Sequence, residues 1–221
     1  PRPPTYPSPT MPPSWPQLRY SLYAPIYDLF AGRFARQRQR SLRLAGPGAQ
    51  DRVLLVGAGT GLDLPELRAC GEVLATDISP AMLARLSRRA ARLGMTVKAQ
   101  VMDAEALDAP DGHYTLVVLH LILAVVDDPI RTLREVERVL APGGRVAVFD
   151  KFLPDGASPP GWRRALNVPL RWLATDINRR FADIVRYTQL RVAHDEPALW
   201  GGTFRVIQLV KPSDSAHHAR S

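Results

Sequence analysis

The chain has 221 residues, enough for one domain with a sizeable core, and its apolar content of 46% is ordinary for a soluble protein. No run of about 18 apolar residues occurs and the proline-rich start lacks an apolar core, so we expect neither a transmembrane helix nor a secretory signal. The single cysteine, Cys70, excludes an internal disulfide and predicts a cytoplasmic location, while the formal charge of +8 favours anionic partners such as phospholipid surfaces, nucleic acid or acidic substrates.

The first 48 residues divide into two parts by composition. Residues 1–17 are so rich in proline that they predict a disordered or polyproline-like tail. Residues 18–48 predict a helical lid, broken near Pro25 and ended by Gly46, with tyrosines among its apolar residues. Its basic side chains are Arg33, Arg36, Arg38, Arg40 and Arg43. Such a helix suits an anionic membrane surface, and the alternative is that its arginines merely face water.

Residues 51–77 contain a strand, a glycine turn, a probable helix and a second strand ending in an acid. The apolar run 53–56 reads as a buried parallel strand and leads into Gly57-Ala58-Gly59-Thr60-Gly61. Glycines permit positive φ and let a ligand approach the backbone, and the N–H groups of the following helix suit a polar ligand. A second run, 73–76, ends in Asp77, whose carboxylate can accept two hydrogen bonds from a ribose. The order predicts a site for an adenosine-containing cofactor.

The spacing of these glycines leaves alternatives open. Dinucleotide sites carry G-x-G-x-x-G, whereas this turn is G-x-G-x-G and Leu62 occupies the later position. The Tyr-x-x-x-Lys pair of one large class of nicotinamide enzymes is not found in the sequence. A nicotinamide-dependent oxidoreductase and a tight turn without a ligand therefore remain alternatives.

The remaining pattern alternates strands and helices and then changes. Up to about residue 150 we predict helices over 80–93, capped by Ser79, and 129–140, and strands over 96–101, 115–119 and 145–149. Repeated β-α units imply a parallel sheet with right-handed crossovers. Residues 151–211 predict helices over 162–173 and 178–188, then an antiparallel pair of strands over 190–194 and 203–210. Residues 212–221 read as a frayed tail, and no metal site is expected.

Four segments together carry a family resemblance: V-L-L-V-G-A-G-T-G, L-A-T-D-I-S-P-A-M-L, V-M-D-A-E-A-L and L-R-E-V-E-R-V-L-A-P-G-G-R-V-A-V-F-D. The combination resembles the class I S-adenosylmethionine-dependent methyltransferases, and R-Y-S-L-Y-A-P-I-Y-D resembles bacterial phosphatidylethanolamine N-methyltransferases and quinone-biosynthesis methyltransferases. The resemblance implies an α/β, Rossmann-like, seven-stranded, mostly parallel sheet whose last strand is antiparallel, with helices on both faces. It implies a single domain over 18–211, with a helical lid (18–48), a cofactor-binding half (51–150) and a substrate-side half (151–211).

The resemblance also implies cofactor contacts for S-adenosyl-L-methionine, residue by residue. The glycine turn would wrap the methionine part, Asp77 would bind the ribose, and Asp103 would accept from the adenine amino group. The full set is Gly57, Ala58, Gly59, Gly61, Asp77, Ile78, Met82, Asp103, Ala104, His120 and Leu121. For Met82 a place in the core is the other interpretation. Leu55 stands where the family usually has an acid, and Asp63 is the candidate to compensate for it.

Three residues are candidates to act on the methyl acceptor. His120 is a proton acceptor or a cofactor-lining residue, and Tyr20 and Tyr27 would orient an amine or pack against its methyl groups. The candidate substrate-binding residues are Asp150, Arg179 and Arg180. In the alternative interpretation, Asp150 caps the segment that follows it, and Arg179 and Arg180 lie on a solvent-exposed helix face.

The predicted enzyme is a methyltransferase for a small molecule or lipid headgroup. The preferred acceptor is the amine of phosphatidylethanolamine, and the second is a quinone precursor or natural product methylated at carbon or oxygen. Strand four ends in L-H-L-I-L and not in the Asn/Asp-Pro-Pro-Tyr/Phe of enzymes that methylate nucleic-acid amino groups, which argues against nucleic acid. We expect a cytoplasmic protein that contacts the inner membrane face peripherally. A cofactor-binding regulator without turnover is the remaining alternative.

Overall fold

A computed structural model of the chain describes residues 32–153 and 179–213. The strands are β1 (Arg52–Val56), β2 (Glu72–Asp77), β3 (Lys98–Val101), β4 (Tyr114–His120), β5 (Leu140–Lys151), β6 (Arg191–Leu199) and β7 (Phe204–Val210). The α-helices are α2 (Ala35–Ala45), α3 (Pro80–Arg92), α4 (Pro129–Val139) and α6 (Phe181–Val185), and the 3₁₀ turns are η1 (Gly32–Phe34), η2 (Leu64–Leu67) and η3 (Trp200–Gly202). The predicted alternation of strands and helices is confirmed for the described residues.

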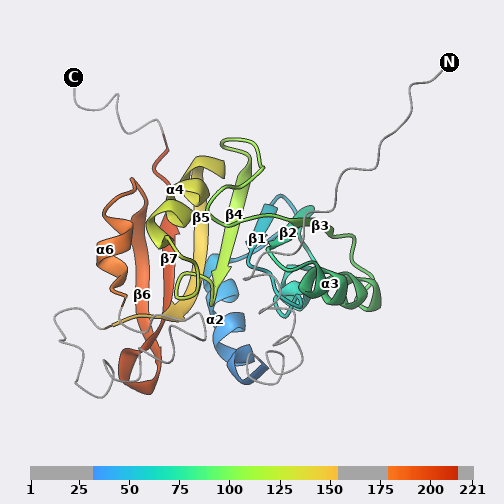
Figure 1. Cartoon of the computed structure of the whole chain (residues 1–221), viewed down its shortest axis with the longest axis horizontal. Coiled ribbons are helices and arrows are strands. Elements are labelled where there is room, and N and C mark those ends of the chain that lie inside the picture. The colour runs from blue at the N-terminus through green and yellow to red at the C-terminus, as the bar shows by residue number, and fades with distance from the viewer. Residues whose placement is uncertain (1–31, 154–178, 214–221) are drawn as a thin grey trace.

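All seven strands form one sheet in the order β3-β2-β1-β4-β5-β7-β6 (Figure 1). Neighbours among the first five strands are parallel, whereas β7 runs antiparallel to both β5 and β6. The central strand β1 is buried along Val53–Val56, which explains its unbroken apolar run. The predicted Rossmann-like sheet with an antiparallel last strand is therefore confirmed, and β6 lies at its edge.

Helices cover both faces of the sheet. On one face, α2, η2 and α3 pack against β1, β2 and β4 through an apolar cluster that includes Leu42, Leu64 and Leu86. On the other face, α4 and α6 pack through a cluster that includes Leu133 and Phe181. Figure 1 shows α3 beside β3 at one end of the sheet and α6 at the opposite end, near β6. The two apolar layers fix the central strands from both sides.

Local sequence signals explain most of the helix ends. Ser79 caps α3, because its hydroxyl accepts from the backbone N–H of Met82 at 3.4 Å. Asp128 caps α4 by accepting from the N–H groups of Ile130 and Arg131, both at 2.9 Å. Gly46, with φ 59°, ends α2 in the left-handed conformation. These caps place the helices as predicted, to within one or two residues at their ends.

Two elements differ from the prediction. The probable helix after the glycine turn is only the short 3₁₀ turn η2, with Pro65 in its first turn. The helix predicted over 178–188 is shorter, Phe181–Val185, and the helix predicted over 162–173 lies outside the described residues. Residues 57–67 therefore form a series of tight turns, and no regular helix presents its free N–H groups directly after the glycines.

An ion pair at the amino-terminal edge of the sheet joins three strands. The carboxylate of Asp51 accepts from Arg145 Nη1 at 2.9 Å and Nη2 at 2.8 Å, from Thr115 Oγ1 at 2.7 Å and from the Gly48 N–H at 2.8 Å. These bonds, led by the hydrogen bond from Arg145, lower the pKa of Asp51 to about 2. The carboxylate must therefore be ionised for the pair to stabilise the fold.

We expect this pair to make stability depend on pH in acid. Because the pKa of Asp51 is lower in the folded than in the unfolded chain, its contribution is complete above about pH 4 and is lost as the pH falls towards 2. Urea unfolding of the wild type and Asp51→Asn at pH 7, 5 and 3 measures the effect. The gap between the two proteins should be largest at pH 7 and should narrow at pH 3, and a gap that is constant with pH would contradict the assignment.

Candidate cofactor and substrate site

Most of the predicted site residues lie at the carboxyl edge of the sheet. The glycine turn follows β1, Asp77 ends β2, and Asp103 follows β3 by two residues. The register pairs Val56 with Thr76 and Asp77 with Val101, so the turn and both carboxyl residues lie at one edge. This juxtaposition is what an adenosine site on a parallel sheet requires.

Asp77 contacts the glycine turn directly. Its Oδ2 accepts from the Gly59 N–H at 2.8 Å, and its Oδ1 accepts from the Ser79 N–H at 2.9 Å. Burial raises the pKa of Asp77, and the two N–H groups partly oppose that rise. Each carboxylate oxygen retains a lone pair for a further donor, so the group fits the two hydroxyls of a ribose. The neighbouring Ile78 is half-buried, as a residue packing on a ligand would be.

The glycines of the turn have the positive φ that the sequence predicted. Gly57, Gly59 and Gly61 have φ of 65°, 55° and 78°. A Cβ on Gly57 would lie 2.5 Å from Ile122 Cδ1, and one on Gly61 would lie 2.9 Å from Leu86 Cγ. The backbone conformation and the close packing both require glycine here.

Gly57→Ala is expected to weaken cofactor binding and to lower the melting temperature. The added methyl clashes with Ile122, and alanine strains the positive φ. Gly94→Ala is the matched control, because Gly94 has φ 67° but open space around its Cβ position. Calorimetric titration with S-adenosylhomocysteine should show about tenfold weaker binding for Gly57→Ala only. Equal binding by the two variants would contradict a role of the turn in the site.

Among the described residues, the end of the predicted site where the adenine would lie is more exposed than the ribose end at Asp77. Asp103 is exposed, and its Oδ1 accepts from the Glu105 N–H at 2.9 Å. Ala104 is half-buried and packs against the core, and Met82 is 3% exposed within α3. Asp103 and Ala104 thus lie at the edge where the adenine contacts were expected, whereas the burial of Met82 favours its alternative role in the core.

The end of β4 carries an unusual backbone conformation. Leu121 has φ 62°, which a residue other than glycine rarely adopts. Its N–H donates to the Phe149 carbonyl at 2.8 Å, and its side chain packs beside Phe149 and Phe204. Strain of this kind is typical of functional sites, and no pattern in the sequence indicated it.

His120, at the same strand end, is 2% exposed and has partners on both ring nitrogens. Its Nδ1 lies 2.9 Å from Asp63 Oδ1, and its Nε2 lies 3.0 Å from Ser41 Oγ. Asp63 in turn accepts two hydrogen bonds from Arg38. In this geometry both nitrogens are engaged within the protein, which leaves none for the proton of a methyl acceptor.

Arg38 corrects one expectation directly. The sequence placed it with the other arginines on a basic outer face, but its side chain is buried with Leu42 and Ala45 on the inner face of α2. The available signal was its spacing, because Arg38, Leu42 and Ala45 lie four and seven residues apart. Ser41, on the same face, was missed in the same way.

Asp150 is fully buried behind the site edge. Its Oδ2 accepts from the Ala124 N–H at 3.1 Å and its Oδ1 from the Lys151 N–H at 2.8 Å. Burial raises the pKa of Asp150, and the nearby charge of Lys151 opposes the rise. Of the two roles considered for it, this geometry favours capping the loop after β4 over direct contact with substrate.

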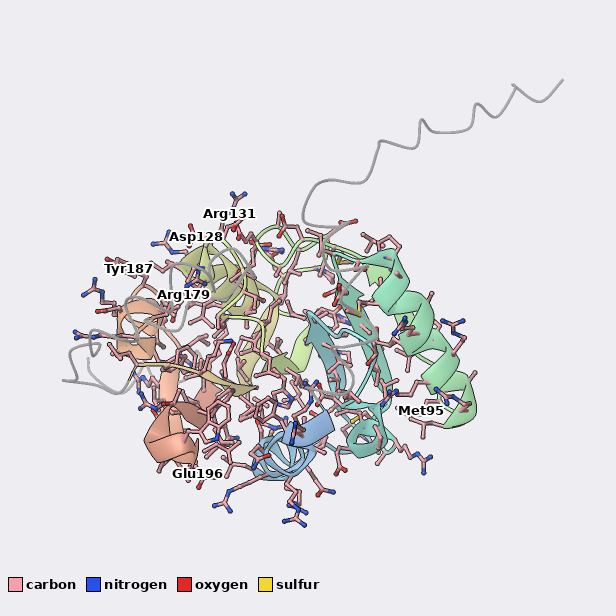
Figure 2. All side chains as sticks on the ribbon, turned by 60° about the horizontal axis from the view of Figure 1, so that its bottom comes forward. Met95, Asp128, Arg131, Arg179, Tyr187 and Glu196 are labelled. Carbon is pink, nitrogen blue, oxygen red and sulfur yellow. The ribbon has the colours of Figure 1, made fainter. Side chains whose placement is uncertain are left out.

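The two arginines predicted to hold a phosphate lie just before α6. Arg179 donates to the carbonyls of Leu123 at 2.6 Å and Asp127 at 3.3 Å, and Figure 2 shows it on the same side of the molecule as Asp128 and Tyr187. Arg180 is half-buried at the N-cap position of α6. Arg179 thus ties the loop after β4 to the start of α6. Tyr20 and Tyr27 lie outside the described residues.

The sheet order, with the glycine turn after β1 and the acid at the end of β2, is that of the class I methyltransferase fold. Residues 54–148 match the protein family described as the methyltransferase domain. The YcgJ protein of Bacillus subtilis has the same fold, with a TM-score of 0.67 at 19% identity over 80% of this chain and 99% of that one.

Two curated relatives are more informative about chemistry. The phosphatidylethanolamine N-methyltransferase of Cereibacter sphaeroides is 29% identical over 185 residues, which span 83% of this chain and 91% of that protein. The demethylmenaquinone methyltransferase of Thermus thermophilus is 37% identical over 139 residues, 59% of this chain and 63% of that protein. Residues 54–148 thus carry a methyltransferase domain, and the chain is similar to methyltransferases that are named for a phospholipid and for a quinone. A nicotinamide oxidoreductase is not favoured.

Proposed function

We propose that the protein transfers a methyl group to the amine of phosphatidylethanolamine. The observation that carries the proposal is the similarity to the Cereibacter sphaeroides enzyme, which extends over 91% of that protein. A match of this length includes segments on both sides of the methyltransferase domain at 54–148, where the residues that contact an acceptor would lie.

The cofactor, when bound, supplies an activated methyl group on a sulfonium, so the protein mainly binds, orients and desolvates. The glycine turn would hold the methionine part of the cofactor, and Asp77 and Asp103 would hold the adenosyl part, as their placement at one edge supports. Tyr20 and Tyr27 would orient the amine, and a water would take its proton, since both nitrogens of His120 already have partners. Arg179 and Arg180 are the candidates for a lipid phosphate, and Arg179 also donates to the carbonyls of Leu123 and Asp127.

A basic outer surface supports contact with an anionic membrane. Exposed arginines lie on η1 and on the helices α2 and α3, which cover one face of the sheet, namely Arg33, Arg36, Arg40, Arg43, Arg88 and Arg92. Of these, Arg40 pairs with Glu196 of β6, which Figure 2 shows near α2. Among the described residues, no helix has both the length and the apolar character to cross a bilayer. The proposal is therefore peripheral contact through charge.

Incubation with labelled S-adenosylmethionine tests the acceptor. Vesicles of phosphatidylglycerol with phosphatidylethanolamine should yield labelled lipid, and the same vesicles without phosphatidylethanolamine should not. Label found only in a demethylmenaquinol or a small amine would overturn the lipid proposal. The demethylmenaquinol arm is included because of the 37% identity to the Thermus thermophilus enzyme.

A further inference from the structure

A closed ring of four buried side chains joins helix α2, the glycine turn and the end of β4. Arg38 Nε donates to Asp63 Oδ1 at 2.9 Å, and Arg38 Nη2 donates to Asp63 Oδ2. His120 Nδ1 lies 2.9 Å from Asp63 Oδ1, and His120 Nε2 lies 3.0 Å from Ser41 Oγ. Arg38 and Ser41 are one helical turn apart on α2, so the ring begins and ends on that helix. We call these four residues the α2 network.

Asp63 sets the direction of one bond in the ring. Its carboxylate only accepts, so Nδ1 of His120 carries a proton and donates to it. The Ser41 hydroxyl lies 3.0 Å from His120 Nε2 and 3.4 Å from the Val148 carbonyl, and its single proton can be donated to one of the two. The positive charge of Arg38 and the negative charge of Asp63 then balance inside the protein. Burial by itself raises the pKa of Asp63, but the charge of Arg38 and the contact with His120 lower it below its usual range. Two parallel hydrogen bonds fix the relative orientation of the Arg38 and Asp63 side chains as well as the distance between them.

The position of Asp63 connects the ring to the cofactor edge. The N–H of Gly61 donates to the Ala58 carbonyl at 3.0 Å, and the N–H of Leu64 donates to the Gly61 carbonyl at 3.2 Å. Asp63 therefore lies within the run of turns that contains Gly59, whose N–H is bound by Asp77. On the other side, His120 directly precedes Leu121 and its positive φ. A displacement of α2 would thus reach both the glycine turn and the strained end of β4.

We propose that Arg38, Asp63, His120 and Ser41 act as positioning residues that fix the glycine turn and the end of β4 relative to α2, so that the seating of α2 sets the affinity for the cofactor. In this role His120 orients Asp63 and does not take a proton from the substrate.

Binding of S-adenosylhomocysteine, measured by calorimetry on the full chain, tests the proposal without an acceptor. Asp63→Asn should weaken binding about tenfold, and Ser41→Ala, which keeps both charges, about threefold. Asp51→Asn is the matched control, because Asp51 is also a carboxylate held by an arginine fork, at the opposite edge of the sheet. It should lower the melting temperature and leave the dissociation constant unchanged.

Two substitutions of His120 separate positioning from other roles. An asparagine amide can replace Nδ1–H as the donor to Asp63, whereas leucine cannot. His120→Asn should therefore bind the cofactor product within about threefold of the wild type, and His120→Leu about tenfold more weakly. If Asp63→Asn and His120→Leu lower the melting temperature yet bind as Asp51→Asn does, the network is merely structural and the proposal is overturned.

The same experiment remains decisive if a variant is poorly folded. Ser41→Ala removes one hydroxyl and should fold, and its dissociation constant alone supports or contradicts the proposal. Asp63→Asn and His120→Leu should also be non-additive in binding, since they break one contact, whereas Asp63→Asn and Asp51→Asn should be additive. Because the readout is cofactor binding, a failure of the lipid proposal leaves it intact.

Discussion

Asp77→Ala is expected to weaken the binding of S-adenosylhomocysteine about 100-fold. Hydrogen bonds to a charged group contribute about 1.5–3 kcal/mol each, and the substitution would remove two of them to the ribose. It would also release the Gly59 N–H, which donates to Asp77 at 2.8 Å, and so loosen the turn that lines the site. Calorimetry on the purified chain measures the change directly.

Asp128→Ala is the control for this result. Like Asp77, Asp128 is an aspartate whose carboxylate accepts from backbone N–H groups, but it caps α4. Its loss should cost about 1 kcal/mol of stability and leave cofactor binding unchanged. Burial raises the pKa of Asp77, so the ionised carboxylate is unfavourable inside the protein. Asp77→Asn removes this charge, and it should therefore reduce the free energy of unfolding by less than it reduces the free energy of cofactor binding. If Asp77→Ala bound S-adenosylhomocysteine with wild-type affinity, the assignment of the adenosyl site to this edge of the sheet would be contradicted.

The second large effect is on stability. Arg38→Leu is expected to lower the free energy of unfolding by about 3–5 kcal/mol, because it leaves the Asp63 carboxylate buried without its cationic partner. The side chains of Arg38 and Asp63 are 6% and 4% exposed, so water cannot replace the lost bonds without rearrangement. Urea unfolding at pH 7, followed by circular dichroism, measures the difference.

A double variant tests the cause of that loss. Arg38→Leu with Asp63→Leu removes both charges and should be more stable than Arg38→Leu alone, since no unpaired carboxylate remains. Arg40→Leu is the surface control, because the Arg40 side chain is 64% exposed and solvent screening leaves its pair with Glu196 little effect on stability. A loss for Arg38→Leu as small as that for Arg40→Leu would contradict the buried pair.

The sequence predicted the sheet because its strands are buried on both faces. Short apolar runs at 53–56 and 115–119 become β1 and β4 with almost no exposed surface, and their shortness favoured strands over helices. The caps at Ser79 and Asp128 lie in local sequence and depend on few distant contacts. The carboxyl residues at one edge followed from the parallel arrangement itself, which needs no side-chain detail.

The side-chain contacts within the site were not predictable in the same way. Whether Arg38 points inward depends on two residues that are distant in the sequence. These are Asp63, 25 residues later, and His120, at the end of β4. Composition alone placed Arg38 with the exposed arginines of α2. The short η2 turn was also mispredicted, because the turns around Gly61 are set by packing against Leu64 and Leu86 and not by helix propensity. Pairing over long sequence distances decides such details.

The place of β7 in the sheet has a consequence for synthesis of the chain. Residues 204–210 lie between β5 and β6, so the flank of β5 along Val146–Phe149 is covered only after these residues have left the ribosome. Until then the nascent chain exposes an unpaired and strongly apolar strand edge, which is prone to pair with other molecules. Chains that stop before residue 204 are therefore expected to aggregate and to depend on chaperones.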